Sequence, residues 1–214
     1  MNLDGTPDEE DVRFYDRYGP WDVLDPIGLR SLMEGFSRPW WVVGGYATEA
    51  FTGVPRPHED IDLVIFGRDV QSMRAHFEGR YHLWSNDGGT IRPLDDKFPE
   101  PFHDRCQIWV REDAHSPWII DCPINPDVDG KWQSKRFDDH VADLDEVTWV
   151  DDRDIRFLNP EIVLLFKAAQ NREKDRFDLE QVWPLLSDDK RGWLRDAIRR
   201  YDDDHPWNER LADA

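Results

Sequence analysis

Two aspartates one residue apart, Asp60 and Asp62, open an apolar run that ends at Phe66. Side chains two positions apart on a strand point to the same face, so we expect both carboxylates at the mouth of a strand over residues 60–66. Neighbouring carboxylates repel each other unless a cation lies between them, and such oxygen ligands suit Mg²⁺. The alternative is a pair of solvated acids on an edge strand, since the chain has 46 acidic residues.

A glycine pair, Gly44-Gly45, follows an expected strand over residues 40–43 and precedes an expected helix over residues 46–51. Free backbone N–H groups at the start of a helix favour an anion, and glycine lets a phosphate group come close to the backbone. The pair could also be a plain tight turn. A phosphate-binding turn and a carboxylate pair on the next strand are far less expected to occur together by chance than either feature alone.

A third acid, Asp121, ends an apolar strand expected over residues 117–122. If this strand lies beside the one that follows Asp60 and Asp62, the three carboxylates form one cluster. Such a cluster can hold two metal ions about 3.5–4 Å apart and clamp the attacking and leaving oxygens of a phosphoryl transfer. The competing interpretation is an acid at the end of an edge strand.

The periodicity of apolar residues predicts an α+β fold in which a mixed α/β part precedes a helical part. Residues 1–24 are expected to form a loose arm, residues 25–155 the mixed-sheet domain and residues 156–214 the helical domain. The stretch 88–103 is expected to be a loop, and the pattern between residues 123 and 156 is weak. Asn159-Pro160-Glu161 is typical of a helix start. Helices are expected over 25–36, 46–51, 69–78, 160–169, 175–186 and 188–201, and further strands over 81–84, 106–110, 146–150 and 155–158.

The composition limits the partners. With 27 basic and 46 acidic residues the formal charge is −19, which disfavours nucleic acid and favours cationic small molecules or cationic protein faces. Two cysteines, Cys106 and Cys122, fit a reduced cytoplasm. No apolar run approaches the roughly 18 residues of a membrane span. The acidic N-terminus does not resemble a signal peptide, so a cytoplasmic location is expected.

The segments GGYA (residues 44–47) and RPHEDIDL (56–63) resemble the nucleotidyltransferase superfamily of the DNA polymerase beta type. Within it the chain looks most like the aminoglycoside 2''-adenylyltransferase-like group. The segment IDC (120–122) resembles the strand of the third acid, LNPEIVLLFK (158–167) the start of the helical domain, and KDRFD (174–178) a Lys-Asp-x-x-Asp element within it. The resemblance covers residues 38–66, 117–123 and 155–207. It implies a mixed-sheet nucleotidyltransferase core followed by a helical C-terminal domain.

The resemblance also implies roles for individual residues. Gly44 and Gly45 would cradle the triphosphate, and Asp60 and Asp62 would hold Mg²⁺. Asp121 would hold a second Mg²⁺ or act as general base on the acceptor hydroxyl. A free aspartate has a pKa near 4 and is a weak base, so activation of the hydroxyl by metal is the more robust mechanism.

Four cationic side chains are further candidates for nucleotide binding. Arg56 and His58 could contact phosphates, although they could also lie in an ordinary loop. Lys167 could reach a phosphate from its helix, or extend along the apolar surface to solvent. Lys174 could line the cleft, or form an ion pair at a helix start.

Three functions remain open. The first is transfer of a nucleoside monophosphate, AMP from ATP or the equivalent from another nucleoside triphosphate, to a hydroxyl of a small cationic acceptor such as an aminoglycoside, as in antibiotic resistance. The second is a toxin-like or regulatory nucleotidyltransferase that modifies a protein or RNA. The third is a non-catalytic nucleotide-binding module, which the intact glycine pair and three acids disfavour. The sequence does not name the acceptor.

Overall fold

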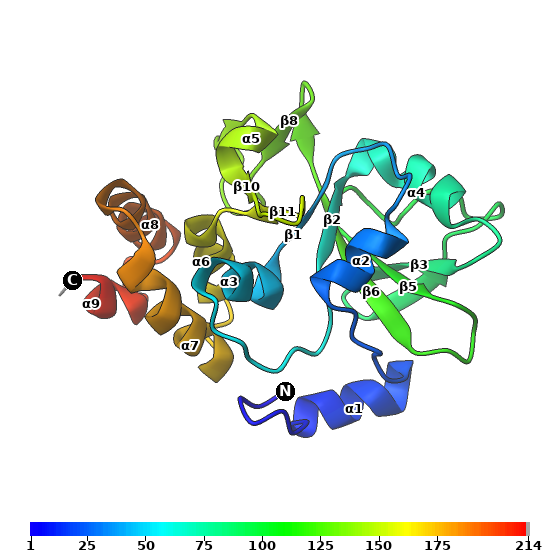
Figure 1. Cartoon of the computed structure of the whole chain (residues 1–214), viewed down its shortest axis with the longest axis horizontal. Coiled ribbons are helices and arrows are strands. Elements are labelled where there is room, and N and C mark those ends of the chain that lie inside the picture. The colour runs from blue at the N-terminus through cyan, green and yellow to red at the C-terminus, as the bar shows by residue number, and fades with distance from the viewer. Residues whose placement is uncertain (213–214) are drawn as a thin grey trace.

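The computed structural model describes residues 1–212, which form a large mixed sheet followed by C-terminal helices (Figure 1). In spatial order, the strands of the eight-stranded sheet are β10 (Thr148–Val150), β11 (Arg156–Leu158), β1 (Trp40–Val42), β2 (Leu63–Phe66), β6 (Trp118–Asn125), β5 (Gln107–Arg111), β3 (His82–Asp87) and β4 (Thr90–Pro93). A three-stranded sheet contains β7 (Asp127–Val128), β8 (Lys131–Gln133) and β9 (Val141–Ala142).

The helices surround the large sheet and continue beyond it. They are α1 (Glu9–Tyr18), α2 (Pro26–Leu32), α3 (Gly44–Thr52), α4 (Val70–Phe77), α5 (Leu144–Val147), α6 (Pro160–Ala168), α7 (Glu173–Val182), α8 (Asp188–Tyr201) and α9 (Trp207–Ala212), with 3₁₀ turns η1 (Gly67–Asp69) and η2 (Trp183–Leu185). The predicted α+β class, a mixed sheet followed by helices, is confirmed.

Strands β2 and β6 lie side by side at the centre of the large sheet. They run parallel, with Ile65 opposite Ile124, whereas β1 pairs antiparallel with the other side of β2. All four residues of β2 are buried, as expected for a strand covered on both faces. The chain that enters β2 therefore lies beside β6, and this places the acids that precede β2 next to the acid in β6.

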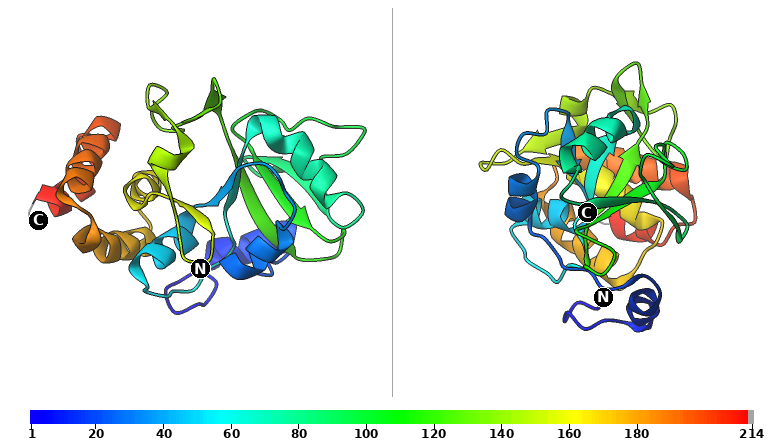
Figure 2. Two further views of the ribbon diagram at one scale, coloured as in Figure 1. Left: turned by 45° about the horizontal axis from the view of Figure 1, so that its top comes forward. Right: turned by 90° about the vertical axis from the view of Figure 1, so that its right-hand side faces the viewer.

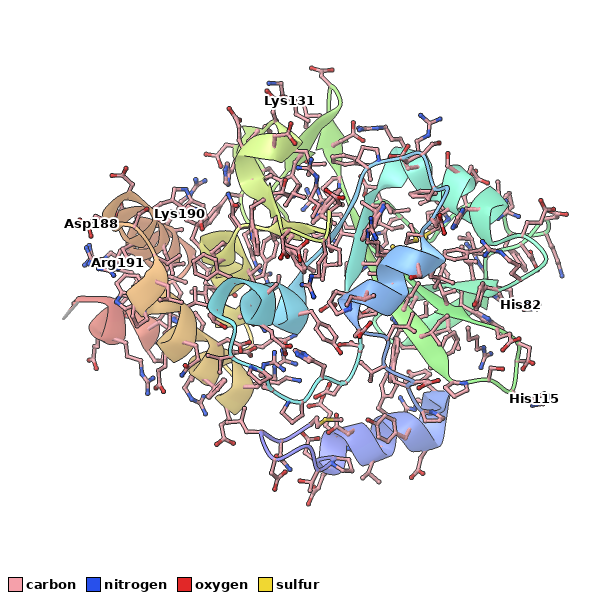
Figure 3. The ribbon with its side chains drawn as sticks, viewed as in Figure 1. His82, His115, Lys131, Asp188, Lys190 and Arg191 are labelled. Atoms are coloured by element: carbon pink, nitrogen blue, oxygen red, sulfur yellow. The ribbon has the colours of Figure 1, made fainter. Side chains whose placement is uncertain are left out.

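The sheet and the C-terminal helices occupy opposite ends of the molecule (Figure 2). The labelled side chains of His82 and His115 lie at the sheet end, and that of Lys190 lies at the helical end (Figure 3). Helix α6 joins the two, because its Ile162 and Val163 belong to the apolar core around the sheet and its next residues belong to the core of the helices. The domain limits at residues 25–155 and 156–214 stay a prediction.

Several segments differ from the expectation; for example, residues 146 and 147, predicted to begin a strand, lie in α5. Residues 9–18, predicted to belong to a loose arm, form α1, which begins with a capping box between Asp8 and Asp11. Residues 90–93, predicted to be loop, form β4, which pairs with β3 through a turn at Gly88 and Gly89. Both glycines have positive φ, as two-residue hairpin turns require. The strands β7 to β9 fall where the sequence pattern is weak, because each has only two or three residues.

Two helix starts show how the local sequence is used. Asp25 caps α2 by accepting the backbone N–H of Gly28 at 2.6 Å. Asn159 precedes Pro160 at the start of α6 as predicted, but its side chain donates to the carbonyl of Glu146 and does not cap the helix. Within residues 1–212, no helix has both the length and the apolar character that crossing a membrane requires.

Candidate active site

The three predicted acids meet at the centre of the sheet. Asp60 and Asp62 lie just ahead of β2, which begins at Leu63 and not at residue 60, and Asp121 lies in β6. Asp62 and Asp121 form an isolated parallel bridge, and the N–H of Asp121 donates to the carbonyl of Ile61 at 3.1 Å. One carboxylate oxygen from each acid lies within 4.8 Å of the other two. Parallel pairing of the two strands thus brings together acids about 60 positions apart.

The cluster is electrostatically unfavourable by itself. Burial, and then the charges of Asp62 and Glu59, raise the pKa of Asp60 to about 7. Burial also raises the pKa of Asp62, and burial together with the other two acids raises that of Asp121 well above its usual range. A divalent cation would remove this repulsion, because it favours the ionised form of all three acids.

The free oxygen of Asp121 gives a second reason to place a cation here. Its Oδ2 accepts a hydrogen bond from the Gln107 amide at 2.7 Å, but its buried Oδ1 accepts no hydrogen bond of ordinary geometry from the described residues, although the nearby Trp109 side chain partly opposes the rise in the pKa of Asp121. A buried acceptor left without a partner costs free energy. Carboxylate oxygens are the ligands that Mg²⁺ prefers, so the donor set fits this ion.

The glycine pair is packed against the acids and the cations. Gly44 starts α3 with a φ of +67°, and a Cβ placed on it would lie 1.8 Å from Oδ2 of Asp62. A Cβ on Gly45 would lie 2.4 Å from Nη2 of Arg56 and 2.6 Å from Nδ1 of His58. Among the described residues no side chain caps this helix start. Only glycine fits at these two positions without moving a neighbouring side chain of the site.

Arg56 and Lys167 share one buried carboxylate. Arg56 donates from Nε and Nη2 to the two oxygens of Asp178 at 2.9 and 3.0 Å, and Nζ of Lys167 lies 2.8 Å from the same group. Lys167 also lies 3.6 Å from Asp175. All four side chains of this network are at most 8% exposed. The loop before β2 is thereby tied to α6 and α7.

His58 and Lys174 have partners of their own. The ring of His58 stacks on Tyr46 at 3.7 Å between centroids, and its Nε2 lies 2.7 Å from Glu49. Burial lowers the pKa of His58, although Glu49 opposes this shift. Lys174 donates to Glu59 at 2.6 Å. Lys174 thus pairs with an acid from the loop before β2, and not within its own helix start as the alternative interpretation had it. The same lysine also lines the cavities described next.

Two adjoining cavities open onto the acid cluster. We call the first the basic cavity; it has a volume of about 340 Å³, and besides the three acids and Glu59 its lining includes Gly44, Gly45, Arg56, His58, Arg136, Lys167, Arg172 and Lys174. We call the second the acidic cavity; it has a volume of about 610 Å³, and its charged and aromatic lining is Asp8, Glu10, Asp11, Phe14, Tyr15, Trp21, Glu59, Asp60, Trp109, Asp121, Arg172, Glu173 and Lys174. Asp60 and Asp121 belong to both.

Several side chains at the site carry no sequence signal. Gln107 lies on β5 and touches Asp121, and Arg136 and Arg172 add charge to the basic cavity. Lys135 lies near the same acid, and burial lowers its pKa to about 8 although Asp121 opposes the shift. The acidic wall from α1 was also missed, because that segment was expected to be loose. Of these residues only Gln107 could have been indicated by the sequence, because it lies on a strand in which side chains alternate between the two faces of the sheet.

Comparison with known proteins supports the fold independently of these residues. No protein-family model matches the sequence, and no curated protein does either. The antibiotic-resistance factor ANT(2'')-Ia in solution is similar in structure, with a TM-score of 0.52 and 18% sequence identity over 80% of this chain and 88% of that one.

Two crystal structures are similar to the same degree. The lincosamide antibiotic adenylyltransferase LnuA with bound lincomycin has a TM-score of 0.52 and 18% identity over 75% of this chain and 95% of that one. ANT(2'')-Ia in complex with adenylyl-2''-tobramycin has a TM-score of 0.51 and 18% identity over 80% and 93%. The chain therefore has the fold of these nucleotidyltransferases, as its sequence predicted.

Proposed function

We propose that this chain is a magnesium-dependent nucleotidyltransferase that moves a nucleoside monophosphate, AMP from ATP, to a hydroxyl group of a small cationic acceptor. One observation carries the proposal: Asp60, Asp62 and Asp121 converge beside a glycine helix start that opens into a cavity rich in cations. The shared fold supports it. No other arrangement among the described residues 1–212 gathers three possible metal ligands.

Asp60, Asp62 and Asp121 would hold Mg²⁺, as two ions if all three take part. When bound, Mg²⁺ neutralises charge on the phosphates and lowers the pKa of a coordinated hydroxyl. Mg²⁺ keeps several waters and usually binds through one or two carboxylates plus phosphate oxygens, so a cluster this small suffices.

The basic cavity would bind the triphosphate. Its anionic oxygens would lie against the start of α3, where backbone N–H groups and the helix dipole favour negative charge. Arg56 and Lys167 would neutralise the β- and γ-phosphates, and Asp178 keeps both cations in place before the nucleotide arrives. Groups fixed in advance stabilise developing charge more than groups that must reorganise.

The acceptor would react at the junction of the two cavities. Its hydroxyl oxygen forms a bond to the α-phosphorus, the bond from that phosphorus to the bridging oxygen breaks, and pyrophosphate leaves. The hydroxyl proton passes to Asp121 or to solvent. Oδ1 of Asp121 is available for this role or for a second metal ion, since Gln107 occupies only Oδ2.

The charge of the acidic cavity supports a cationic acceptor. Seven acidic side chains line it against two basic ones, and four aromatic rings form part of its wall. A cleft of one charge sign concentrates ligands of the opposite sign. The two similar proteins were solved with lincomycin and with adenylyl-2''-tobramycin, so both take an antibiotic of small size.

The test is incubation with Mg²⁺, ATP labelled on the α-phosphate and a panel of hydroxylated amines that includes tobramycin and lincomycin. We expect label on an acceptor together with one equivalent of pyrophosphate. Label on the chain itself or on an added protein would favour the toxin-like or regulatory alternative. ATP binding with no pyrophosphate release from any acceptor would contradict the proposal and leave a nucleotide-binding module.

A further inference from the structure

A line of polar side chains crosses one face of the large sheet and ends at Asp121. Strands β6, β5 and β3 are neighbours in that sheet (Figure 1). Trp109 of β5 lies opposite Asp121 of β6, and Gln107 of β5 lies opposite Asn86 of β3. Side chains alternate along a strand, so Gln107 and Trp109, two positions apart, point to the same face. Asp121, Gln107 and Asn86 therefore share one face across three strands.

Hydrogen bonds join these side chains in a single direction. The backbone N–H of Gly89 donates to Oδ1 of Asn86 at 3.0 Å, and Nδ2 of Asn86 donates to Oε1 of Gln107 at 2.9 Å. Nε2 of Gln107 then donates to Oδ2 of Asp121 at 2.7 Å. A backbone N–H can only donate and an ionised carboxylate can only accept. Both ends of the series therefore require the same orientation of the two amides.

The turn that begins this series is itself held in place. Gly88 and Gly89 form the two-residue turn between β3 and β4, and the carbonyl of Gly89 accepts the Tyr18 hydroxyl at 2.7 Å. Gly89 has a φ of +85°, and a Cβ on it would lie 2.4 Å from that hydroxyl oxygen. Both backbone polar groups of Gly89 are thus bonded, so the N–H that orients Asn86 has a fixed position.

Asn86 lies too deep in the protein to contact a substrate. It is 3% exposed and lines neither cavity, whereas Gln107 lines both. Asparagine is depleted in strands, and a buried amide costs free energy unless its polar atoms are hydrogen-bonded. Asn86 meets this requirement by bonding to Gln107, and it can act on the acid cluster through that residue.

We propose that Gln107 and Asn86 are positioning residues that hold the carboxylate of Asp121 in one orientation. Gln107 occupies Oδ2, which leaves Oδ1 for a metal ion or for the acceptor hydroxyl. Asn86 keeps the N–H group of Gln107, and not its carbonyl oxygen, towards the acid. A carboxylate free to rotate would lose rotamer entropy when it binds metal. This inference rests on the proposed function and adds two residues to its site.

Gln107→Met and Asn86→Leu test the two steps separately. Gln107→Met removes the donor to Asp121 and keeps an unbranched side chain. Asn86→Leu leaves Gln107 in place but removes the amide that orients it, with the same branching of heavy atoms. Asn125→Leu is the matched control. Asn125 is also 3% exposed and lies in β6, but its amide donates to two backbone carbonyls, at 2.7 and 3.1 Å, and lines neither cavity.

Mn²⁺ binding to the full chain is measured without ATP by electron paramagnetic resonance, which detects the free ion. Pyrophosphate release with the acceptor found in the panel above gives kcat and the KM for ATP. We expect Gln107→Met and Asn86→Leu each to raise the Kd for Mn²⁺ and to lower kcat about tenfold or more, with a smaller change in KM. Residues that orient metal ligands commonly contribute about 10- to 100-fold to metal affinity or activity.

The double variant separates positioning from a general loss of stability. Gln107→Met combined with Asn86→Leu should bind Mn²⁺ no more weakly than Gln107→Met alone, because Asn86 acts through Gln107. Asn125→Leu should leave the Kd and kcat within about twofold of the wild type. Asn86→Ala takes the place of Asn86→Leu if circular dichroism shows the latter to be unfolded.

Three results would overturn the positioning role. The first is a Kd for Mn²⁺ that is the same in Asn86→Leu and Asn125→Leu, and the second is a double variant whose loss equals the product of the two single losses. The third is a wild type that binds no Mn²⁺. Failure of the proposed function alone gives a different pattern, in which no acceptor releases pyrophosphate while Mn²⁺ binding still depends on Gln107 and Asn86.

Discussion

The two cavities that flank the acid cluster are built differently. In the basic cavity, the cations Arg56 and Lys167 are locked by Asp178 in a buried network that joins two helices to the loop before β2. In the acidic cavity, a single helix at the molecular edge supplies much of the wall, and Asp8 and Asp11 keep part of their surface open to solvent. Two cations of the basic cavity are thus fixed by a buried carboxylate, whereas the acids that α1 contributes to the acidic cavity are partly exposed.

This difference fits the demands on each side. A triphosphate has the same shape and charge in every reaction of this kind, so groups fixed in advance lose little on binding. Acceptors differ in shape, and a wall formed by an edge helix can change without disturbing the core. We therefore expect substitutions in the basic cavity to affect all acceptors equally, and substitutions in the acidic wall to affect acceptors selectively.

The largest effect is expected at the acids that both cavities share. Asp60→Asn or Asp121→Asn should lower kcat/KM for every acceptor about a thousandfold, since metal-ion stabilisation contributes several kcal/mol to the transition state. Asp87→Asn is the control, because Asp87 is an exposed acid at the end of β3 that pairs with His103. Steady-state kinetics with Mg²⁺ and ATP measures this. Full activity in either cluster variant would place the chemistry elsewhere.

The next effect concerns the glycine that separates α3 from the acids. Gly44→Ala should lower kcat/KM at least about a hundredfold, because its Cβ must displace the Asp62 carboxylate. Gly53→Ala shares the strain of a positive φ, +71° against +67°, but its Cβ meets nothing within 4 Å. The control should therefore lose about 1 kcal/mol of stability and no activity. Equal loss of activity in both variants would trace the effect to backbone strain.

A smaller, one-sided effect is expected at Asp178, which positions the cations of the basic cavity. Asp178→Asn should raise the KM for ATP about tenfold while kcat and acceptor selectivity change less, and Asp178→Glu should recover part of the loss. Loss of a buried partner also costs about 3–5 kcal/mol of stability, so the kinetics are measured at low temperature.

Glu161→Gln is the matched control for that variant. It breaks the ion pair between the buried carboxylate of Glu161 and the exposed amino group of Lys190, which lie 3.0 Å apart where α6 meets α8. Lys190 lies at the helical end of the molecule (Figure 3), and neither Glu161 nor Lys190 lines the basic cavity. This variant should be destabilised with an unchanged KM for ATP. A raised KM in both variants would mean that Asp178 acts through stability alone.

The smallest effect is a dependence of stability on pH in the absence of metal. A pKa near 7 for Asp60 in the folded state, against 3.8 when unfolded, means that only the unfolded chain releases this proton between those values. Metal-free protein should therefore lose stability from this group as pH rises from about 4 to 7. In thermal melts with EDTA, the Tm of Asp60→Asn should be higher than that of the wild type at pH 8 and nearly equal to it at pH 4.5. Addition of Mg²⁺ at pH 8 should reverse the difference, because the ion stabilises only the wild type. A constant difference would contradict the raised pKa.

The sequence predicts the acid cluster and the glycine pair better than the wall of the acidic cavity, for physical reasons. Strand, glycine pair and acid spacing are local patterns, so the convergence of Asp60, Asp62 and Asp121 could be expected once β2 and β6 were assumed to be neighbours. The network around Asp178 depends on where α7 packs, which no local pattern reports. The wall from α1 was missed because its helix is mostly polar and is held by distant rings such as Trp109.

The most direct test of the central claim is a crystal structure with Mn²⁺ and α,β-methylene ATP, which binds but cannot transfer its nucleotide. Anomalous scattering locates the metal without bias. The account predicts a Mn²⁺ peak coordinated by Asp60 and Asp62, with or without a second at Asp121, and the triphosphate in the basic cavity against Gly44 and Gly45. A metal bound away from the three acids, or a triphosphate lying in the acidic cavity, would contradict it.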